Sequence, residues 1–519
     1  MAKRSAWNRR EFLRALGSGV FLGLASGSRA ATGAGRYPFS LGVASGYPAP
    51  DSVVLWTRVA PDPLAPMGGM PPEPVPVFWE VARDQAFRAI VADGVHYATP
   101  DWAHSVHVEV MGLRPDHEYW YRFRVGDAIS QIGRTRTAPV PGRDPARLRF
   151  GLGSCQHFEQ GWFVAHRHIA EDALDLFVHV GDYIYESSWG RQRVRRHGTP
   201  EPYTLDDYRS RYALYKSDPD LQAAHATCPW LVIWDDHEVD NDYAASRSEN
   251  DDDPAVFLRR RAAAYRAYYE HMPLRRSMMP SGPNLRLHTR VDHARLARFH
   301  LLDDRQYRSR QPCAAGVRDR PEAARDCRGR DDPAATMLGR EQEQWLQAGL
   351  EASEARWNFV AQQTLMAQVD FIAGPEEWYG ADSWDGYPAA RRRLLEGLAV
   401  GRPSNPVVLG GDLHSFWVTD LKTDFLDDAS PVVATEFVTT SITSDPVPER
   451  YIEGAVSINP HVSFATGLHR GYLRLDLTAQ RLIADLRAVD SVQDPASGCA
   501  TLASFVVENG RPGATAVST

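Results

Sequence analysis

The stretch "LFVHVGDYIYES", Leu176–Ser187, decides the fold of this chain. Its largely apolar run has the length of a buried strand rather than of a helix. Gly181 and Asp182 follow the run at once, and Tyr185 stands three residues later. Strands buried on both faces, with polar groups just past their carboxyl ends, are typical of an α/β core in which ligands bind beyond those ends.

Three other segments repeat this arrangement. The strand-like "LRFGLGSCQ" leads to Cys155, and "PVVLGGDLHS" leads to Asp412 and His414. The third, "PWLVIWDDHEVDND", ends in an acidic run composed of Asp235, Asp236, His237, Glu238, Asp240, Asn241 and Asp242. Anionic groups withdrawn from water at one place need a multivalent cation to hold them together. The four strand ends therefore predict a metal site.

Each of these residues has a more ordinary interpretation when it is taken alone. Cys155 could be a small buried apolar side chain, and Tyr185 and His414 could be core residues with satisfied polar groups. The shared position at strand ends favours ligation. Thiolate and phenolate beside carboxylates indicate Fe³⁺ rather than Zn²⁺, and the oxygen-rich acidic run indicates a second ion such as Ca²⁺ or Mg²⁺.

The chain before this core has a different pattern. Across residues 37–141, alternating segments such as "SVVLWTRV" and "EYWYRFRV" are separated by turns, which predicts an all-β sandwich of immunoglobulin or fibronectin type. Residues 149–505 alternate strands with helices and should form the α/β domain. Cys313 and Cys327 are expected to form a disulfide in an oxidising compartment. The final residues, 511–519, are expected to be a loose tail.

The first thirty residues resemble an export signal. Arg9 and Arg10 precede a weakly apolar stretch and the sequence Ser28-Arg29-Ala30, so residues 1–30 are interpreted as a twin-arginine signal peptide. A Sec signal or a membrane anchor is the alternative. No other apolar run of the sequence has the length of a membrane span. We expect a periplasmic or secreted protein with no stable membrane anchor, exported through the twin-arginine translocase.

The net charge limits the kind of partner that the protein can bind. The formal charge of −8 becomes about −13 without the signal, which contains six basic residues and one acidic residue. Such a charge argues against binding long nucleic acids by electrostatic attraction alone. Small phosphate compounds remain compatible with it, because a metal site attracts them locally.

The motifs together resemble the alkaline phosphatase D (PhoD) family of exported phosphohydrolases. The resemblance also includes "FSLGVASGYPAPDSVVLWTR", "NFVAQQTLMAQ" and "EFVTTSITS", and it runs from Phe39 to about Leu477. It implies a calcineurin-like metallophosphoesterase core of four layers, α/β/β/α, at residues 149–505, preceded by the immunoglobulin-like domain at 37–141. One motif that commonly reads Ser-Gly-Asp-Pro is "SGYP" here, with Tyr47 in place of the aspartate.

The resemblance further implies one Fe³⁺ ion and one or more Ca²⁺ ions. The implied ligands are Cys155, Asp182 and Tyr185 for iron, with Asp182 bridging to calcium, and Asp236, Asn241 and Asp412 to complete the pair of sites. Which ion each of the last three binds is left open. His237 and His414 fall at positions that elsewhere in the superfamily help to protonate the leaving group or bind metal.

These features predict a hydrolase that releases inorganic phosphate from small phosphate monoesters. Metal-activated water would attack phosphorus in line with the leaving oxygen. The predicted catalytic residues are Asp182, His414 and His237, of which His237 is expected to act as general acid or to support the metal ligands. A phosphodiesterase or phospholipase-type activity at the same bimetal site is one alternative, and an inactive binding protein is another. We expect a monomer that does not require nucleic acid.

Overall fold

The computed structural model of the chain describes residues 36–190, 192–312, 328–373 and 378–517. The expected signal peptide at 1–30 and the expected disulfide between Cys313 and Cys327 lie outside the described residues. Tyr37–Thr519 form one compact unit. Among the described helices, none combines the length and the apolar character that a membrane span requires.

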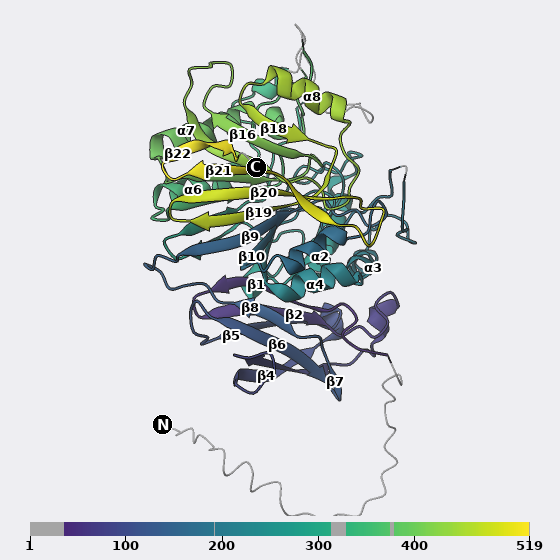
Figure 1. Ribbon diagram of the computed structural model, residues 1–519. Coiled ribbons are helices and arrows are strands. Elements are labelled where there is room, and N and C mark those ends of the chain that lie inside the picture. The colour runs from purple at the N-terminus through teal and green to yellow at the C-terminus, as the bar shows by residue number, and fades with distance from the viewer. Residues whose placement is uncertain (1–35, 191, 313–327, 374–377, 518–519) are drawn as a thin grey trace, which may run out of the picture. The chain divides into compact units, whose positions relative to one another are not determined.

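Ten strands form the larger of two main sheets (Figure 1). β9 (Arg147–Gly153), β10 (Leu176–His179) and β11 (Pro229–Val232) are neighbours and run parallel. Their carboxyl ends therefore meet at one end of the sheet. The sheet continues beyond β9 with β19 (Arg470–Thr478), β20 (Arg481–Val489), β21 (Cys499–Glu508) and β22 (Arg511–Ala516), and beyond β11 with β1 (Val43–Ala49), β2 (Ser52–Arg58) and β5 (Ser105–Met111).

The second sheet has seven strands, and its central strands are also parallel. In sheet order they are β12 (Thr289–His293), β13 (Ala297–Leu301), β14 (Trp357–Ala361), β15 (Pro406–Gly410), β17 (Val432–Val438), β16 (Phe416–Lys422) and β18 (Val462–Thr466). β13, β14, β15 and β17 run in the same direction. The two sheets thus give a mixed α/β fold in which several carboxyl strand ends can meet.

The main hydrophobic core joins the two sheets. Phe150 of β9 packs edge to face against Phe299 of β13 and Phe359 of β14, with ring centroids 5.2 and 5.1 Å apart. On the other face of the larger sheet, Phe177 and Trp230 lie beside His166, which belongs to a helix. Burial of these aromatic rings contributes a large share of the hydrophobic stabilisation of such a core.

Helices flank both sheets. The helices are α2 (Val164–Glu171), α3 (Leu205–Lys216), α4 (Pro219–Thr227), α5 (Pro254–His271), α6 (Gly339–Glu351), α7 (Pro388–Gly401) and α8 (Glu449–Ile458). α2, α3 and α4 lie beside the larger sheet (Figure 1). A second core cluster joins Leu346 of α6 and Leu395 of α7 to Val360 and Val408 of the seven-stranded sheet. Both sheets are therefore covered on the sides that they do not turn toward each other.

The N-terminal strands do not form a sheet system separate from the α/β part. β1 pairs in parallel with β11, with Ser45 opposite Pro229. A third sheet packs on this extension through Val77, Tyr121 and Phe123. It consists of β4 (Ile90–Ala98), β3 (Val75–Ala82), β6 (Glu118–Val125), β7 (Ala128–Ile129) and β8 (Gly133–Arg136). Backbone pairing thus crosses from the 37–141 segment into the 149–505 segment.

Tyr47 accounts for the unusual "SGYP" motif. Its side chain is buried, and its hydroxyl donates a hydrogen bond to the carbonyl oxygen of Val232 at 2.8 Å. The phenol thus links the first strand to the end of β11, which leads into the acidic loop.

The expectation of a loose C-terminal tail is wrong for most of that segment. Residues Arg511–Ala516 form β22, which pairs with β21. The backbone N–H of Gly513 also donates to the hydroxyl of Thr435 in the other sheet at 2.9 Å. The tail is ordered because its backbone groups complete an edge strand that also contacts the second sheet.

Candidate metal site

Four loops bring the expected metal ligands together at the carboxyl ends of strands. Cys155, Asp182, Asp236 and Asp412 follow β9, β10, β11 and β15 within a few residues. Cys155, Asp182 and Asp412 adopt left-handed backbone conformations, with φ of 58°, 55° and 65°. Non-glycine residues in this region carry strain of about 1–3 kcal/mol each and are concentrated at functional sites.

Gly181 allows two of these loops to touch. Its φ is 112°, and a Cβ atom at this position would lie 2.4 Å from the Cβ atom of Asp235, so no larger residue fits. The buried Glu238 then fixes the contact. Its carboxylate accepts the backbone N–H groups of Asp182 at 3.1 Å and of Asp235 at 2.8 Å, and also that of Tyr183. The two acidic loops are therefore held at a fixed spacing.

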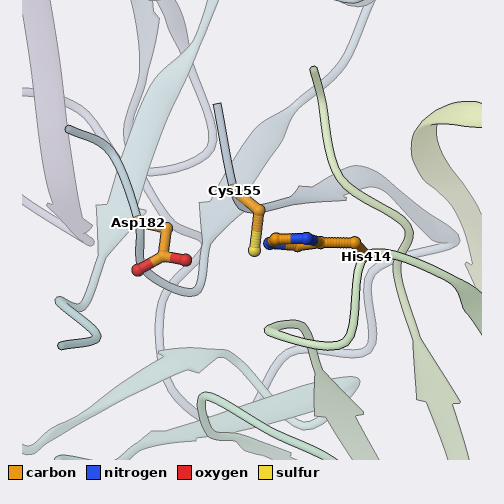
Figure 2. Close-up of side chains that lie close together, drawn as sticks. All are labelled: Cys155, Asp182 and His414. Atoms are coloured by element: carbon orange, nitrogen blue, oxygen red, sulfur yellow. The ribbon is translucent and has the colours of Figure 1, made fainter. Parts of the chain in front are cut away.

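The side chains of these loops form three overlapping groups whose candidate ligand atoms lie within 4.8 Å of one another. The groups are Cys155, Asp182 and His414; Asp182, Asp236 and His237; and Asp182, Asp235, Asp236 and Asp412. Figure 2 shows the sulfur of Cys155 between the carboxylate of Asp182 and the ring of His414. Because Asp182 belongs to all three groups, its two oxygens are suited to bridge two ions.

Tyr185 joins the first group through its phenol oxygen. The hydroxyl donates to Oδ2 of Asp182 at 2.8 Å and lies 3.1 Å from Nε2 of His414. Nδ1 of His414 is 2.7 Å from the carbonyl oxygen of Asp445, so Nδ1 carries the proton and Nε2 keeps its lone pair. Burial, together with the charge of Arg470, lowers the pKa of His414 to about 3. The imidazole is therefore neutral at physiological pH and able to bind a metal ion.

A buried arginine, Arg305, lies within the acidic part of the site. Its guanidinium contacts Asp235 and Asp382, and it lies 3.4 Å from an oxygen of Asp236 and 3.5 Å from an oxygen of Asp412. The side chain is 0% exposed. Arg308 also pairs with Asp382, at 2.6 Å. Two buried guanidinium groups thus face four carboxylates, which leaves the cluster with an excess of negative charge.

The crowded carboxyl groups favour binding of additional cations. Burial raises the pKa of Asp182 and of Asp235 well above the usual value, and it raises that of Asp412 to about 6. Oδ1 of Asp182 and Oδ2 of Asp235 are buried and have no hydrogen-bond partner within the described ranges. Thiol, phenol, neutral imidazole and carboxylate oxygens in one place are a donor set that metal ions satisfy. The residues present thus fit the expected metal ions.

His237 lies against this cluster. Its Nδ1 is 2.7 Å from Oε2 of Glu186, and its ring packs on that of Tyr185 with centroids 4.1 Å apart. Burial alone would lower the pKa of His237, but the carboxylates of Glu186, Asp182 and Asp236 raise it well above the usual value. The imidazole is therefore protonated at neutral pH.

One expected ligand has a different contact. The side-chain amide of Asn241 donates to Oε1 of Glu249 at 3.0 Å, and its backbone N–H donates to Glu186 at 3.3 Å. Sequence reasoning also missed two residues of the site. Glu186 stands inside a quoted motif and could have been noticed as a further acid, whereas Arg305 in "LLDDRQY" gave no local signal. Glu238 was included in the acidic run, but its contacts with the backbone of the two loops were not predicted.

The fold and the site together define the class of protein. Paired sheets with a ligand cluster for metal ions at their strand ends are the architecture of a metallophosphoesterase-like hydrolase. The model for "PhoD-like phosphatase" matches residues 150–486, and the model for "PhoD-like phosphatase, N-terminal domain" matches residues 25–139. The chain belongs to the PhoD-like phosphatase family, as its motifs indicated, and it is a phosphohydrolase.

Individual relatives agree with this assignment. The chain is 44% identical to alkaline phosphatase D of Bacillus subtilis (strain 168) over 99% of its own length and 90% of that protein. A solved structure of PhoD shares 45% identity and a TM-score of 0.88 over 93% of each chain. Purple acid phosphatase PPD1 from yellow lupin seeds shares the fold alone, with 13% identity and a TM-score of 0.56 over 92% of this chain and 75% of that one.

Proposed function

We propose that the protein is an alkaline phosphatase that releases inorganic phosphate from phosphate monoesters, with Fe³⁺ and Ca²⁺ as its metal ions. The observation that carries this proposal is the position of Asp182, whose carboxylate belongs to every group of candidate ligands. We assign Cys155, Asp182 and Tyr185 to iron, with Asp182 bridging to calcium, and Asp236, Asn241 and Asp412 complete the pair of sites. When bound, the ions supply Lewis-acid activation of water and neutralise the charge of the phosphate.

The contact of Asn241 with Glu249 is compatible with a role as a metal ligand. The amide nitrogen Nδ2 donates to Glu249, whereas a calcium ion would bind the amide oxygen Oδ1. We include Asn241 in the site on the strength of the family motif.

The chain's own residues perform the proton transfer in this scheme. His237 is protonated, lies next to the cluster and is held by Glu186, so we assign it as the general acid that protonates the leaving oxygen. His414 presents an unprotonated Nε2 toward Tyr185 and Cys155, which supports a role in holding the iron side of the site. Trp189 packs parallel to the ring of His414, with the two ring centroids 6.0 Å apart, and so supports its orientation.

The proposal is tested by metal analysis and absorption spectroscopy of the purified protein. D182N should lose bound metal and activity, and Y185F should lose the visible absorption of a phenolate-to-iron bond. Full turnover by D182N, or an unchanged spectrum in Y185F, would contradict the assignment. The ratio of kcat/KM for an aryl phosphate monoester to that for the matching diester decides the substrate class, since a ratio near or below one would indicate a phosphodiesterase.

We further propose the finer architecture and the cellular location. Residues 37–141 would form an immunoglobulin-like domain and residues 149–505 a four-layer α/β/β/α catalytic domain, which the facing sheets and their flanking helices support. Residues 1–30 would direct export by the twin-arginine translocase, so that a monomeric enzyme acts in the periplasm or outside the cell. Fusing residues 1–30 to a reporter protein and measuring the export of the reporter tests this location. The control is the same fusion with Arg9 and Arg10 changed to lysine.

A further inference from the structure

A cavity of about 390 Å³ lies beside the β12–β13 hairpin and helix α6, and none of the expected metal ligands lines it. Its lining residues are Ser277, Met278, Arg286, His288, Thr289, Arg290 and Trp345. No carboxylate is among them. The walls therefore offer two guanidinium groups, an imidazole and two hydroxyl groups, all of which can donate hydrogen bonds to an anion.

Basic residues stand at alternate positions of the segment 286–290. Leu285 and Leu287 are buried in the main core. Arg286 is exposed, His288 and Arg290 are half-buried, and all three line the cavity. One short segment thus brings three basic residues to the same cavity.

Arg290 is held in place by helix α6. Its guanidinium lies 4.1 Å from the ring centroid of Trp345, and it donates to the carbonyl oxygen of the same residue. A Cβ atom on Gly349 would lie 2.2 Å from Nε of Arg290, so this glycine provides the space for the guanidinium. Nε is buried and lacks a hydrogen-bond partner in the described part of the chain. The guanidinium of Arg290 is therefore held in a fixed orientation at the wall of the cavity.

His288 and Arg286 also line the cavity. The ring of His288 packs edge to face on Trp345 at 5.0 Å, and its Nδ1 is buried without a partner in the regions that the structure describes. Burial and then the charges of Arg286 and Arg290 lower the pKa of His288 to about 4. Arg286 is exposed and makes no ion pair with any described residue. The nearby carboxylate of Asp292 is bound to Arg298 at 2.6 and 3.0 Å.

We propose that this cavity is a second anion site, separate from the metal site, and that it binds a phosphate group. Two guanidinium groups without carboxylate partners attract a dianion, and planar guanidinium matches the geometry of phosphate oxygens. The cavity is large enough for phosphate together with part of an ester, so its ligand is either the inorganic phosphate that the enzyme releases or the phosphate group of a larger ester.

Equilibrium dialysis of the metal-loaded enzyme against radiolabelled inorganic phosphate at low ionic strength tests the site. R286M should lose one class of bound phosphate, or weaken it about tenfold or more, because a hydrogen bond to a charged group is worth about 1.5–3 kcal/mol. R276M removes an exposed arginine that lies next to the cavity-lining Ser277 but does not itself line the cavity, and it should bind phosphate as the wild type does. Both variants should keep the kcat and KM of the wild type for an aryl phosphate.

The outcomes separate the possibilities. Identical binding curves for the wild type, R286M and R276M would overturn the proposal, and so would an equal loss in both variants, which indicates only general electrostatic attraction. H288Q provides a second test inside the cavity and should weaken the same class of phosphate. Competition dialysis with phenylphosphonate, an ester analogue, distinguishes inorganic phosphate from a phosphate ester as the ligand. If phenylphosphonate displaces the radiolabelled phosphate more strongly than unlabelled phosphate does, the cavity binds an ester; if it displaces it less strongly, the cavity binds inorganic phosphate.

Discussion

Replacing Arg305 by methionine removes a buried positive charge that contacts Asp235, Asp236, Asp382 and Asp412. Methionine keeps much of the length of the side chain, and it leaves Asp235, Asp236 and Asp412 without their guanidinium, whereas Asp382 still pairs with Arg308. Removing one partner of a buried ion pair typically costs about 3–5 kcal/mol. We therefore expect R305M without added metal to lose about that much free energy of unfolding, measured by urea denaturation followed by fluorescence and circular dichroism.

Added calcium should increase the free energy of unfolding of R305M more than that of the wild type. A ligand present at 100 times its Kd stabilises the folded state by about 2.7 kcal/mol, and the unpaired carboxylates of R305M should bind the ion more tightly. R391M is a matched control, because Arg391 is also buried and pairs with Asp385 away from the site. It should lose stability and gain from added calcium only as much as the wild type does. An equal response of the two variants to calcium would refute the reasoning, and so would an unchanged free energy of unfolding in R305M.

The pH dependence of R305M has a defined sign. Burial already raises the pKa of Asp412 to about 6, and Arg305 opposes this rise. Without Arg305 the pKa of Asp412 in the folded state rises further. The folded state then keeps a proton at pH values where the unfolded state has released it. Stability is then lost as the pH increases from about 4 through this pKa. The deficit of R305M relative to the wild type should be smaller at pH 5 than at pH 8.

Two further predictions concern the positions around the site. G181A should lose at least about 2 kcal/mol of unfolding free energy and most of its bound metal, because the added methyl group would collide with Asp235; normal metal content by elemental analysis would contradict the close approach. K216M should be more stable than the wild type near pH 7, because burial lowers the pKa of Lys216 to about 7 and the folded state holds this amine at a desolvation cost. This pKa lies below the value of 10.5 in the unfolded chain, so the stability of the wild type should rise between about pH 7 and 10. Urea titrations at several pH values should show that K216M lacks this rise. An unchanged pH slope in K216M would show that Lys216 is not the group responsible.

Much of the candidate site could be predicted because its signals are local. Each of the four strand ends is an apolar run followed at once by a polar residue, so Cys155, Asp182, Asp236 and Asp412 were found without knowing which strands are neighbours. The parallel pairing of β9, β10 and β11 then places Cys155, Asp182 and Asp236 at one end of the larger sheet, and β15 of the second sheet brings Asp412 to the same site. The same pattern predicted the α/β core, and the resemblance to a family added the expected roles of His237 and His414.

Contacts between distant segments could not be predicted in the same way. Arg305 reaches Asp235, 70 residues earlier, and Asp412, 107 residues later, so no window of the sequence contains the pair. The hydroxyl of Tyr47 bonds to a residue 185 positions away. The final strand, β22, looks like a polar tail because an edge strand with one exposed face has few apolar residues.

The sequence by itself determined which chemical groups this protein holds and that strands deliver them, because apolar periodicity and the residue that ends a strand are properties of a few adjacent residues. The tertiary structure decided how those groups are charged and which of them meet. Burial and neighbouring charges set the protonation of His237 and His414 in opposite directions, although both are histidines in short quoted motifs. Desolvation and Coulomb interactions depend on distances in space, and only the folded chain fixes those distances.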